Sequence, residues 1–248
     1  MSTIDVFYDL ETTGIDAVLD RVCQFAAVVR HGGDEVLRYV SYANPHPRKM
    51  HPMAQQTTGI THQQLEGAPV FRDLWMDFCK QLEAALKARG VEGEGCCRFI
   101  GHNNVTFDNI MLQAELRRCH LHMRVCSFSI QTSDTLRAVR IAKKSKLMLL
   151  ENAKLSTVYE KVMKKPLVNA HDALADCDAV LRIVESCGII KRLLAFESWS
   201  SVDAILDTRL AKRGIVLDYV TKHHQVRCAL CPVTYSSFFT HACKRIRK

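Results

Sequence analysis

The stretch Val6–Ile15, VFYDLETTGI, decides the fold and places two like charges at the end of an apolar segment. An apolar run ends in two carboxylates, Asp9 and Glu11, and Thr-Thr-Gly follows. Because side chains alternate between the two faces of a strand, Asp9 and Glu11 point the same way. Like charges this close repel, and a divalent cation with hard oxygen ligands is their usual compensation. On this pair alone, a solvated strand end is the alternative interpretation.

The composition predicts a globular protein with a basic appendage. The chain has 248 residues, of which 48% are hydrophobic, enough for a full core. The formal net charge of +8 is uneven: residues 191–248 contain eleven Lys and Arg against four Asp and Glu, which leaves about +1 for residues 1–190. A basic C-terminal module on a near-neutral body favours a polyanionic partner, with nucleic acid as the first candidate.

The N-terminus and the cysteines indicate the cellular compartment. The first residues lack the basic and apolar regions of a signal peptide, and no apolar run approaches the roughly 20 residues of a membrane span. Eleven cysteines in such a chain are typical of reduced thiols or metal ligands. We expect a soluble intracellular protein, cytoplasmic or nuclear, with no membrane partner.

Hydrophobic periodicity and turn residues predict an α/β fold, with a mixed β-sheet flanked by helices. Gly188 is expected to end the last long helix, which divides the chain into domains 1–190 and 191–248. The expected strands are Thr3–Tyr8, Val22–Arg30, Glu35–Tyr42, Cys97–Gly101 and Val125–Ile130. The expected helices are Met53–Thr58, Val70–Ala88, Phe107–Cys119, Thr135–Lys143, Glu151–Lys161 and Ala170–Cys187.

Two later segments supply further carboxylates. In IGHNNVTFDNIML, Ile100–Leu112, Asp108 stands at the start of a helix, and in NAHDALADCDAVL, Asn169–Leu181, His171 precedes Asp176 by five residues. Five helical residues turn through about 140°, so His171 and Asp176 converge only if His171 lies in the lead-in turn and folds back. Taken singly, they are more typical of a surface histidine and a solvated aspartate.

Three segments in this order resemble the motifs of the DEDDh 3′-to-5′ exonucleases, the family of bacterial polymerase proofreading subunits and three-prime repair exonucleases. They are DLETTG (Asp9–Gly14), GHNNVTFDNIMLQAELRR (Gly101–Arg118) and HDALAD (His171–Asp176). The resemblance covers about residues 3–185 and implies a ribonuclease H-like fold. The second motif is one residue longer between His102 and Asp108 than the commoner form, which puts a role for His102 or Asn103 in doubt.

The resemblance implies the site residues. It implies two Mg²⁺ or Mn²⁺ ions on Asp9, Glu11, Asp108 and Asp176, with His171 as general base. Asp178 does not fit the motif spacing. The candidate substrate contacts are Thr12, Thr13, Gly14, Asn104, Phe107 and Asp134, of which Phe107 is equally well a core residue.

The implied activity is metal-dependent hydrolysis of phosphodiester bonds at nucleic-acid 3′ ends, which releases nucleoside 5′-monophosphates. Single-stranded DNA and RNA are both candidate substrates, because the contacts to the 2′-hydroxyl that distinguish them cannot be located in the sequence. One alternative is a proofreading or accessory subunit of a polymerase or nuclease complex. Another is a nucleic-acid-binding protein that has kept the fold without catalysis, against which the full carboxylate set argues.

The C-terminal module contains a candidate zinc site. Cys228 and Cys231 form a C-x₂-C pair that His241 and Cys243 would complete, with His223 or His224 as substitutes. A chance pair or a redox-active pair is the alternative. Aromatic and basic residues around it suit single-stranded nucleic acid, and the module is also a candidate for contact with a protein partner or a second copy of the chain.

Overall fold

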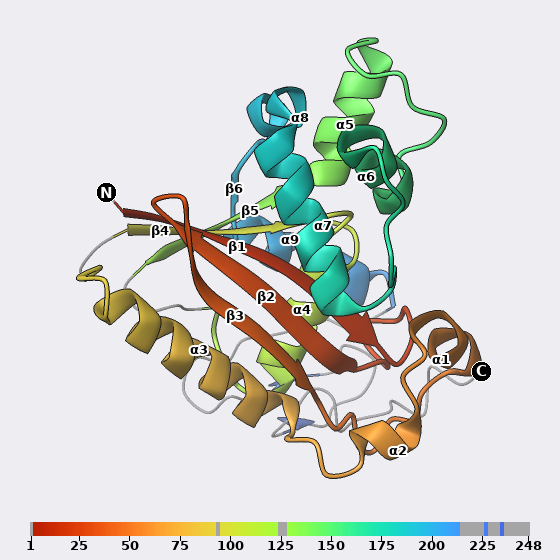
Figure 1. The fold of residues 1–248 in the computed structure, drawn as a ribbon. Helices are drawn as coiled ribbons and strands as arrows, with labels where there is room; N and C mark the ends of the chain where they lie inside the picture. Colours follow the sequence, from red (N-terminus) through yellow and green to blue (C-terminus); the bar gives the residue numbers. More distant parts are fainter. Residues whose placement is uncertain (1, 93–94, 124–127, 214–225, 228–233, 236–248) are drawn as a thin grey trace.

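The computed structural model describes residues 2–92, 95–123, 128–213, 226–227 and 234–235. Its centre is a mixed six-stranded sheet (Figure 1). β1 is the central strand, antiparallel to β2 and parallel to β4. In sheet order the strands are β3 (Asp34–Tyr42), β2 (Val22–His31), β1 (Ser2–Thr12), β4 (Gly95–Gly101), β5 (Ser129–Asp134) and β6 (Glu197–Ser198). Two further short strands pair with each other, β7 (Val226–Arg227) and β8 (Thr234–Tyr235).

Helices cover both faces of this sheet, as Figure 1 shows. Within the part of the chain that the structure describes, every helix is too short or too polar to span a lipid bilayer. The helices are α1 (Pro52–Thr58), α2 (His62–Leu65), α3 (Phe71–Lys87), α4 (Asp108–Arg118), α5 (Thr135–Lys144), α6 (Leu155–Met163), α7 (Ala173–Ser186), α8 (Gly188–Leu193) and α9 (Ser200–Ala211).

Because β1 is covered on both faces, its apolar residues do not alternate with solvent. Val6 and Tyr8 pack into the core formed with α3, α4 and α9, whereas Phe7 packs on the opposite face against α7. α3 presents its apolar residues at the three- and four-residue spacing of an amphipathic helix, from Phe71 to Leu86. α5, α6 and α8 pack beside α7 in a further cluster. The expected α/β fold with a mixed sheet is confirmed.

The fifth strand lies later in the chain than expected. The apolar pattern predicts Val125–Ile130, of which residues 125–127 lie outside the described part of the chain. β5 is Ser129–Asp134, whose last three residues are buried although they are polar. Hydrogen bonds explain this burial: Thr132 Oγ1 accepts from Asn109 Nδ2 at 3.0 Å, and the Ser133 carbonyl accepts from Asn104 Nδ2 at 3.0 Å. A polar network therefore takes the place of the expected apolar contacts.

The packed core continues past residue 190. Gly188 begins α8, and β6 then joins the main sheet beside β5. Trp199 is buried in the core that contains β1, and its Nε1 donates to Gln113 Oε1 of α4 at 2.9 Å. The division into domains 1–190 and 191–248, with a separate basic C-terminal module, remains a prediction. The candidate zinc ligands Cys228, Cys231, His241 and Cys243 lie outside the described residues, so metal analysis of the purified chain must test that site.

Candidate active site

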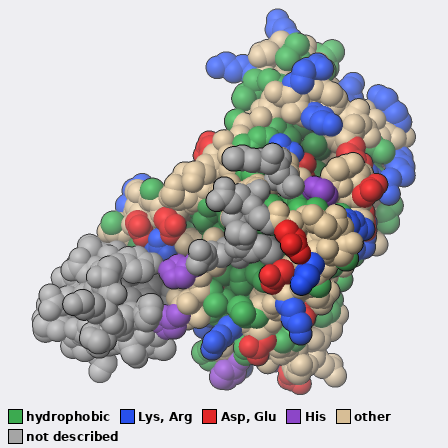
Figure 2. All heavy atoms as spheres, turned by 90° about the vertical axis from the view of Figure 1, so that its left-hand side faces the viewer, with side chains coloured by type: hydrophobic (Ala, Val, Ile, Leu, Met, Phe, Trp, Pro, Cys, Tyr) green, Lys and Arg blue, Asp and Glu red, His purple; other side chains and the backbone are tan. Residues whose placement is uncertain are grey.

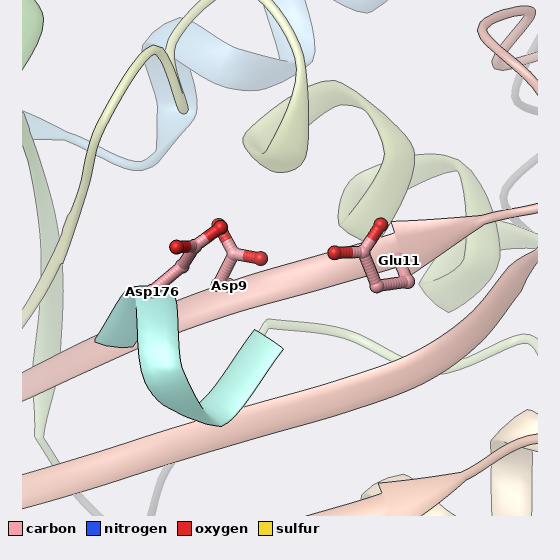
Figure 3. A group of neighbouring side chains, drawn as sticks. All are labelled: Asp9, Glu11 and Asp176. Atoms are coloured by element: carbon pink, nitrogen blue, oxygen red, sulfur yellow. The ribbon is translucent and has the colours of Figure 1, made fainter. Parts of the chain in front are cut away.

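Three carboxylates from two elements meet at the end of β1. Oxygens of Asp9, Glu11 and Asp176 all lie within 4.8 Å of one another. Figure 3 shows the three side chains on the same side of β1, with Asp176 carried by the first turn of α7. Asp9 and Glu11 alternate with Leu10, so they lie on the face of β1 that α7 covers. The expected grouping of carboxylates far apart in the sequence is present.

A fourth carboxylate lies against the same strand. Asp108 is the first residue of α4, and its Oδ1 accepts a hydrogen bond from the backbone amide of Leu10 at 3.2 Å. This bond ties the start of α4 to β1 between the two acidic residues of the strand. All four carboxylates line one cleft of about 570 Å³.

The carboxylates raise one another's pKa. Burial, followed by the charges of Asp176 and Asp108, raises the pKa of Glu11 to about 8. Burial also raises the pKa of Asp108, to about 7, with Asp134 and Asp176 adding to the effect. The pKa of Asp9 lies well above its usual range, because the surrounding protein desolvates its carboxylate and the carboxylate faces Asp108, Asp176 and Glu11. At neutral pH the cluster therefore favours protons or cations over free negative charge.

Asp176 has an oxygen that the protein leaves unsatisfied. Its Oδ1 is buried without a hydrogen-bond partner among the described residues, while its Oδ2 accepts from the amide of His171 at 3.1 Å. A buried carboxylate oxygen without a donor is costly unless a cation contacts it. Asp176 is therefore suited to hold a divalent cation together with Asp9 and Glu11.

His171 lies in the lead-in turn to α7. Its backbone is left-handed, with a φ of 71°, and α7 begins two residues later at Ala173. This turn folds His171 back over the first helical turn, where its amide reaches Asp176. The exposed side chain lines the cleft together with the carboxylates. The structure thus brings His171 and Asp176 together in the manner that their five-residue separation requires.

The six candidate substrate contacts divide into two groups. Thr12, Gly14 and Phe107 line the cleft. The other three, Thr13, Asn104 and Asp134, are buried and are absent from the lining of this cleft. Asp134 Oδ1 accepts from the amides of Asn103 and Leu136, both at 2.8 Å, and so caps α5 and fastens the loop after β4. Its contacts are those of a structural residue.

The loop Thr12–Gly14 is held by Asp20, which sequence reasoning missed. A Cβ at Gly14 would lie 2.6 Å from Asp20 Cγ, so only glycine fits there without displacing the carboxylate. Asp20 in turn accepts from the amide of Asp16 at 2.9 Å and from Arg48 Nε at 2.8 Å. An acidic residue that follows a Thr-Thr-Gly turn was the available signal, but nothing in the sequence links Asp20 to the distant Arg48.

α1 and its lead-in loop form another wall that the sequence did not predict. The lining includes His51, Met53, Ala54, Thr57 and Thr58. The amide of His51 donates to the carbonyl of Thr13 at 2.8 Å, which fixes this wall to the end of β1. The Pro- and His-rich segment before α1 has the composition of a linker and carries no periodic signal.

Comparisons with known proteins identify the family of this chain. The RNase T family model, described as exonuclease, matches residues 6–184. DNA polymerase III PolC-type from Oceanobacillus iheyensis is 43% identical over 76 residues, which is 29% of this chain and 5% of the polymerase. The corresponding protein of Halalkalibacterium halodurans is 26% identical over 174 residues, or 70% of this chain and 10% of the polymerase. The chain therefore spans a tenth or less of these two polymerases.

Solved structures of Escherichia coli exonuclease I share the fold. The zinc-bound complex of that enzyme with single-stranded DNA has a TM-score of 0.57 at 21% identity, over 86% of this chain and 44% of that one. The complex with a dA16 oligonucleotide has a TM-score of 0.55 at 22% identity, over 85% and 44% of the two chains. The expected ribonuclease H-like exonuclease fold is thereby confirmed.

Proposed function

The chain belongs to the RNase T exonuclease family, and from this premise we propose that it hydrolyses phosphodiester bonds at nucleic-acid 3′ ends by a two-metal mechanism. The observation that carries the proposal is the cluster of Asp9, Glu11 and Asp176, with oxygens within 4.8 Å of one another in a cleft. Asp108 completes a set of four carboxylates whose charge two dications would balance. The product would be nucleoside 5′-monophosphates.

The residues present fit divalent cations. Carboxylate oxygens are the hard ligands that Mg²⁺ and Mn²⁺ prefer, and the unpartnered Oδ1 of Asp176 points to a missing positive charge. We assign the cations to Asp9, Glu11, Asp108 and Asp176. When bound, two such ions supply Lewis-acid activation of the attacking water and stabilisation of the leaving oxygen.

His171 would remove the proton from the attacking water. Its side chain is exposed at the rim of the cleft, and its main chain is fixed to Asp176. A histidine imidazole exchanges protons near neutral pH, which suits a general base. Because its position is set by the backbone, the imidazole is free to meet solvent and substrate.

The cleft also provides apolar surface for a nucleobase. Ile15 and Met53 line it as residues that are 88% and 71% exposed, and Phe107 lines it half-buried. Exposed apolar side chains beside a carboxylate cluster suit a ligand with a flat apolar part and a charged part, as a nucleotide has. Thr12 and Gly14 would place backbone close to the terminal nucleotide.

The experiment is hydrolysis of 5′-labelled single-stranded DNA and RNA of one sequence, with Mg²⁺, with Mn²⁺ and with EDTA. We expect products that shorten from the 3′ end only when metal is present, and the faster ladder identifies the preferred nucleic acid. Asp9→Asn is the matched control, because it keeps the side chain's shape and removes its charge. Cleavage in EDTA, or full activity of Asp9→Asn, would contradict the two-metal proposal.

A second candidate function is proofreading, which the similarity to PolC-type polymerases favours. A proofreading exonuclease acts on primer ends that have left the duplex, so mismatched 3′ ends should be shortened faster than matched ends. Equal rates on both duplexes, with fast hydrolysis of free single strands, would favour a freestanding exonuclease instead.

A further inference from the structure

We propose that α5, α6 and the segment leading to His171 form a second contact area, which binds the phosphate backbone of the substrate strand beyond the cleft. This inference rests on the proposed function and extends it from the 3′ end to the rest of the strand. We call this area the lysine surface. Its cations are Arg137, Arg140, Lys143, Lys144, Lys146, Lys154, Lys161, Lys164 and Lys165.

Charge is concentrated on this surface. Residues 135–171 contain nine Lys and Arg but two Asp and Glu, a surplus of +7, and all nine cations are exposed. The rest of residues 1–190 contains fourteen Lys and Arg against twenty Asp and Glu, a deficit of 6. The near-neutral body therefore consists of one strongly basic part and an acidic remainder. Figure 2 shows Lys and Arg gathered at the upper end of the molecule, the end that α5, α6 and α8 form in Figure 1.

Contacts within the protein account for few of these cations; one such contact is the hydrogen bond that Lys143 Nζ donates to the Glu151 carbonyl at 2.6 Å. Among the described residues, Arg137 pairs with Glu197 at 2.6 Å, and no other ion pair involves the lysine surface. Cations in the last turns of α5 and α6 are favourable for the helix dipole. Lys146 and Lys165 lie past those turns, and Lys154 precedes α6, so the dipole does not explain them. Crowded like charges cost stability, which an external polyanion would offset.

The lysine surface is continuous with the cleft. Lys154 precedes Leu155, which lines the cleft at the start of α6. His102, another lining residue, lies 2.9 Å from the Ala153 carbonyl through Nε2 and 2.9 Å from Thr135 Oγ1 through Nδ1. The first residue of α5 and the lead-in to α6 thus adjoin the cleft wall. Figure 1 shows the chain running from α6 down to the start of α7, beside the end of β1.

A strand that leaves the cleft would cross this surface. α6 has nine residues and extends about 13 Å, so a strand must be several nucleotides long to reach its far end. A substrate of two or three nucleotides would occupy the cleft alone. Each phosphate that a lysine neutralises releases counterions, and for single strands it contributes about 0.7 to the slope of log K against log salt concentration.

The test compares two triple variants with equal loss of charge. Lys154→Ala/Lys161→Ala/Lys165→Ala removes cations along α6, and Arg72→Ala/Lys80→Ala/Lys87→Ala removes exposed cations from α3. Fluorescence anisotropy in EDTA gives the Kd for a 3-nucleotide and a 30-nucleotide single strand, at several salt concentrations. Single-turnover hydrolysis of the 3-nucleotide strand with Mg²⁺ follows the chemical step, and thermal unfolding confirms that each variant is folded.

For the α6 variant we expect about a tenfold higher Kd for the 30-nucleotide strand and a salt slope smaller by about 2. Its Kd and hydrolysis rate for the 3-nucleotide strand should stay unchanged, as should all values for the α3 variant. An unchanged Kd for the long strand, or an equal loss for both strands, would overturn the inference. If the unsubstituted chain fails to hydrolyse either strand but the α6 variant alone loses affinity for the long one, the proposed function fails and the contact area stands.

Discussion

The backbone amide of His171 lies 3.1 Å from Asp176 Oδ2 and donates a hydrogen bond to it. The left-handed backbone at His171 makes this bond possible, because it turns the chain back just before α7. The proposed general base and a proposed metal ligand are therefore connected through main chain rather than through the imidazole. Substitution of the imidazole should leave the carboxylate in place, so that the two roles can be separated by experiment.

His171→Ala should lower kcat while leaving metal affinity unchanged. Loss of a general base typically lowers a rate by about 10² to 10⁴. Because the amide that holds Asp176 remains, the Kd for Mn²⁺ measured by calorimetry should match that of the unsubstituted protein. His62→Ala, at an exposed histidine of α2, is the control and should have no effect. A parallel loss of Mn²⁺ binding would show that His171 acts by positioning Asp176.

Asp9→Asn should abolish hydrolysis and stabilise the metal-free protein. The pKa of Asp9 is raised by burial and by Asp108, Asp176 and Glu11, so its charged form is disfavoured in the folded state. A neutral amide removes this repulsion, and the Tm in EDTA at pH 8 should rise. The lost metal contact should lower kcat by about 10³ or more. A lower Tm in EDTA would mean that repulsion does not limit the stability of the empty cluster.

Metal-free protein should become less stable as pH rises from about 4.5 to about 8. The pKa of Glu11 is about 8 in the folded protein against an ordinary value of 4.5, so the folded state retains a proton that the unfolded chain releases. Folding stability therefore falls across this window. Mg²⁺ should reverse the loss at pH 8, by about 2.7 kcal/mol at 100 times its Kd.

Urea titrations at several pH values, with EDTA and with Mg²⁺, measure this effect. Glu11→Gln is the control, because it removes one of the titrating carboxylates and should reduce the pH dependence in EDTA, while Asp9 and Asp108, whose pKa values are also raised, keep the rest of it. Stability that rises with pH in EDTA would be incompatible with the raised pKa of Glu11.

Gly14→Ala should destabilise the cleft wall. Its Cβ would lie 2.6 Å from Asp20 Cγ, and Asp20 is held by Asp16 and Arg48. Overpacking of this kind typically costs about 1 to 3 kcal/mol, and we expect a raised KM because Gly14 lines the cleft. Gly188→Ala is the matched control, because its Cβ would meet Arg192 Nη1 at 3.4 Å, an ordinary contact. Equal Tm and KM for the two variants would show that the loop yields without cost.

Trp199→Ala should destabilise the whole sheet domain. Trp199 is buried against Phe99 of β4 and donates to Gln113, although it follows the boundary expected at residue 190. Truncation of a buried tryptophan typically costs about 3 to 5 kcal/mol. Urea unfolding should show one transition with a lower midpoint, and Leu149→Ala, at a side chain 77% exposed, should not change it. Loss of only a separate second transition would support a domain division near residue 190.

The carboxylate cluster could be predicted because its residues stand where regular elements begin or end. Asp9 and Glu11 follow the alternation of a strand, and Asp108 and Asp176 fall in the first turns of helices. The family resemblance supplied the connection between these segments. The wall formed by α1 could not be predicted in this way, because contacts between distant segments hold it, namely the hydrogen bond from the His51 amide to Thr13 and that from Arg48 to Asp20.

The position of β5 and the structural role of Asp134 both depend on hydrogen bonds between polar groups that lie far apart in the sequence. The sequence pattern favours an apolar strand before Ile130, whereas the real strand buries Thr132 and Ser133 through amide side chains of distant segments. Asp134 is buried by the same packing and accepts two backbone hydrogen bonds. Hydrophobic periodicity shows which residues face an apolar core. It cannot predict the burial of polar side chains whose hydrogen-bond partners lie far away in the sequence.

The net charge of residues 1–190 does not reveal how the charged residues are distributed over the fold. Residues 1–190 carry about +1, which suggests a neutral domain beside a basic tail. In the fold, this net charge divides into the basic lysine surface at α5 and α6 and an acidic remainder, which includes the carboxylate cluster of Asp9, Glu11 and Asp176. The positions of these two helices beside the cleft are what suggest a role in substrate binding for the separated charges.

The central place of β1 has a consequence for motion. β1 pairs with β2 from Ile4 to Thr12 and with β4 from Ser2 to Phe7, and beyond Phe7 the amide of Leu10 donates to Asp108. The amides of β1 should therefore exchange with deuterium only when the whole domain opens. The amides of α1 and of the turn at His171, on elements without such ladders, should exchange much sooner. The rate of substrate entry would then depend on fast local motions of α1 and of the turn at His171. The carboxylates on β1 would keep their distances from each other throughout each turnover.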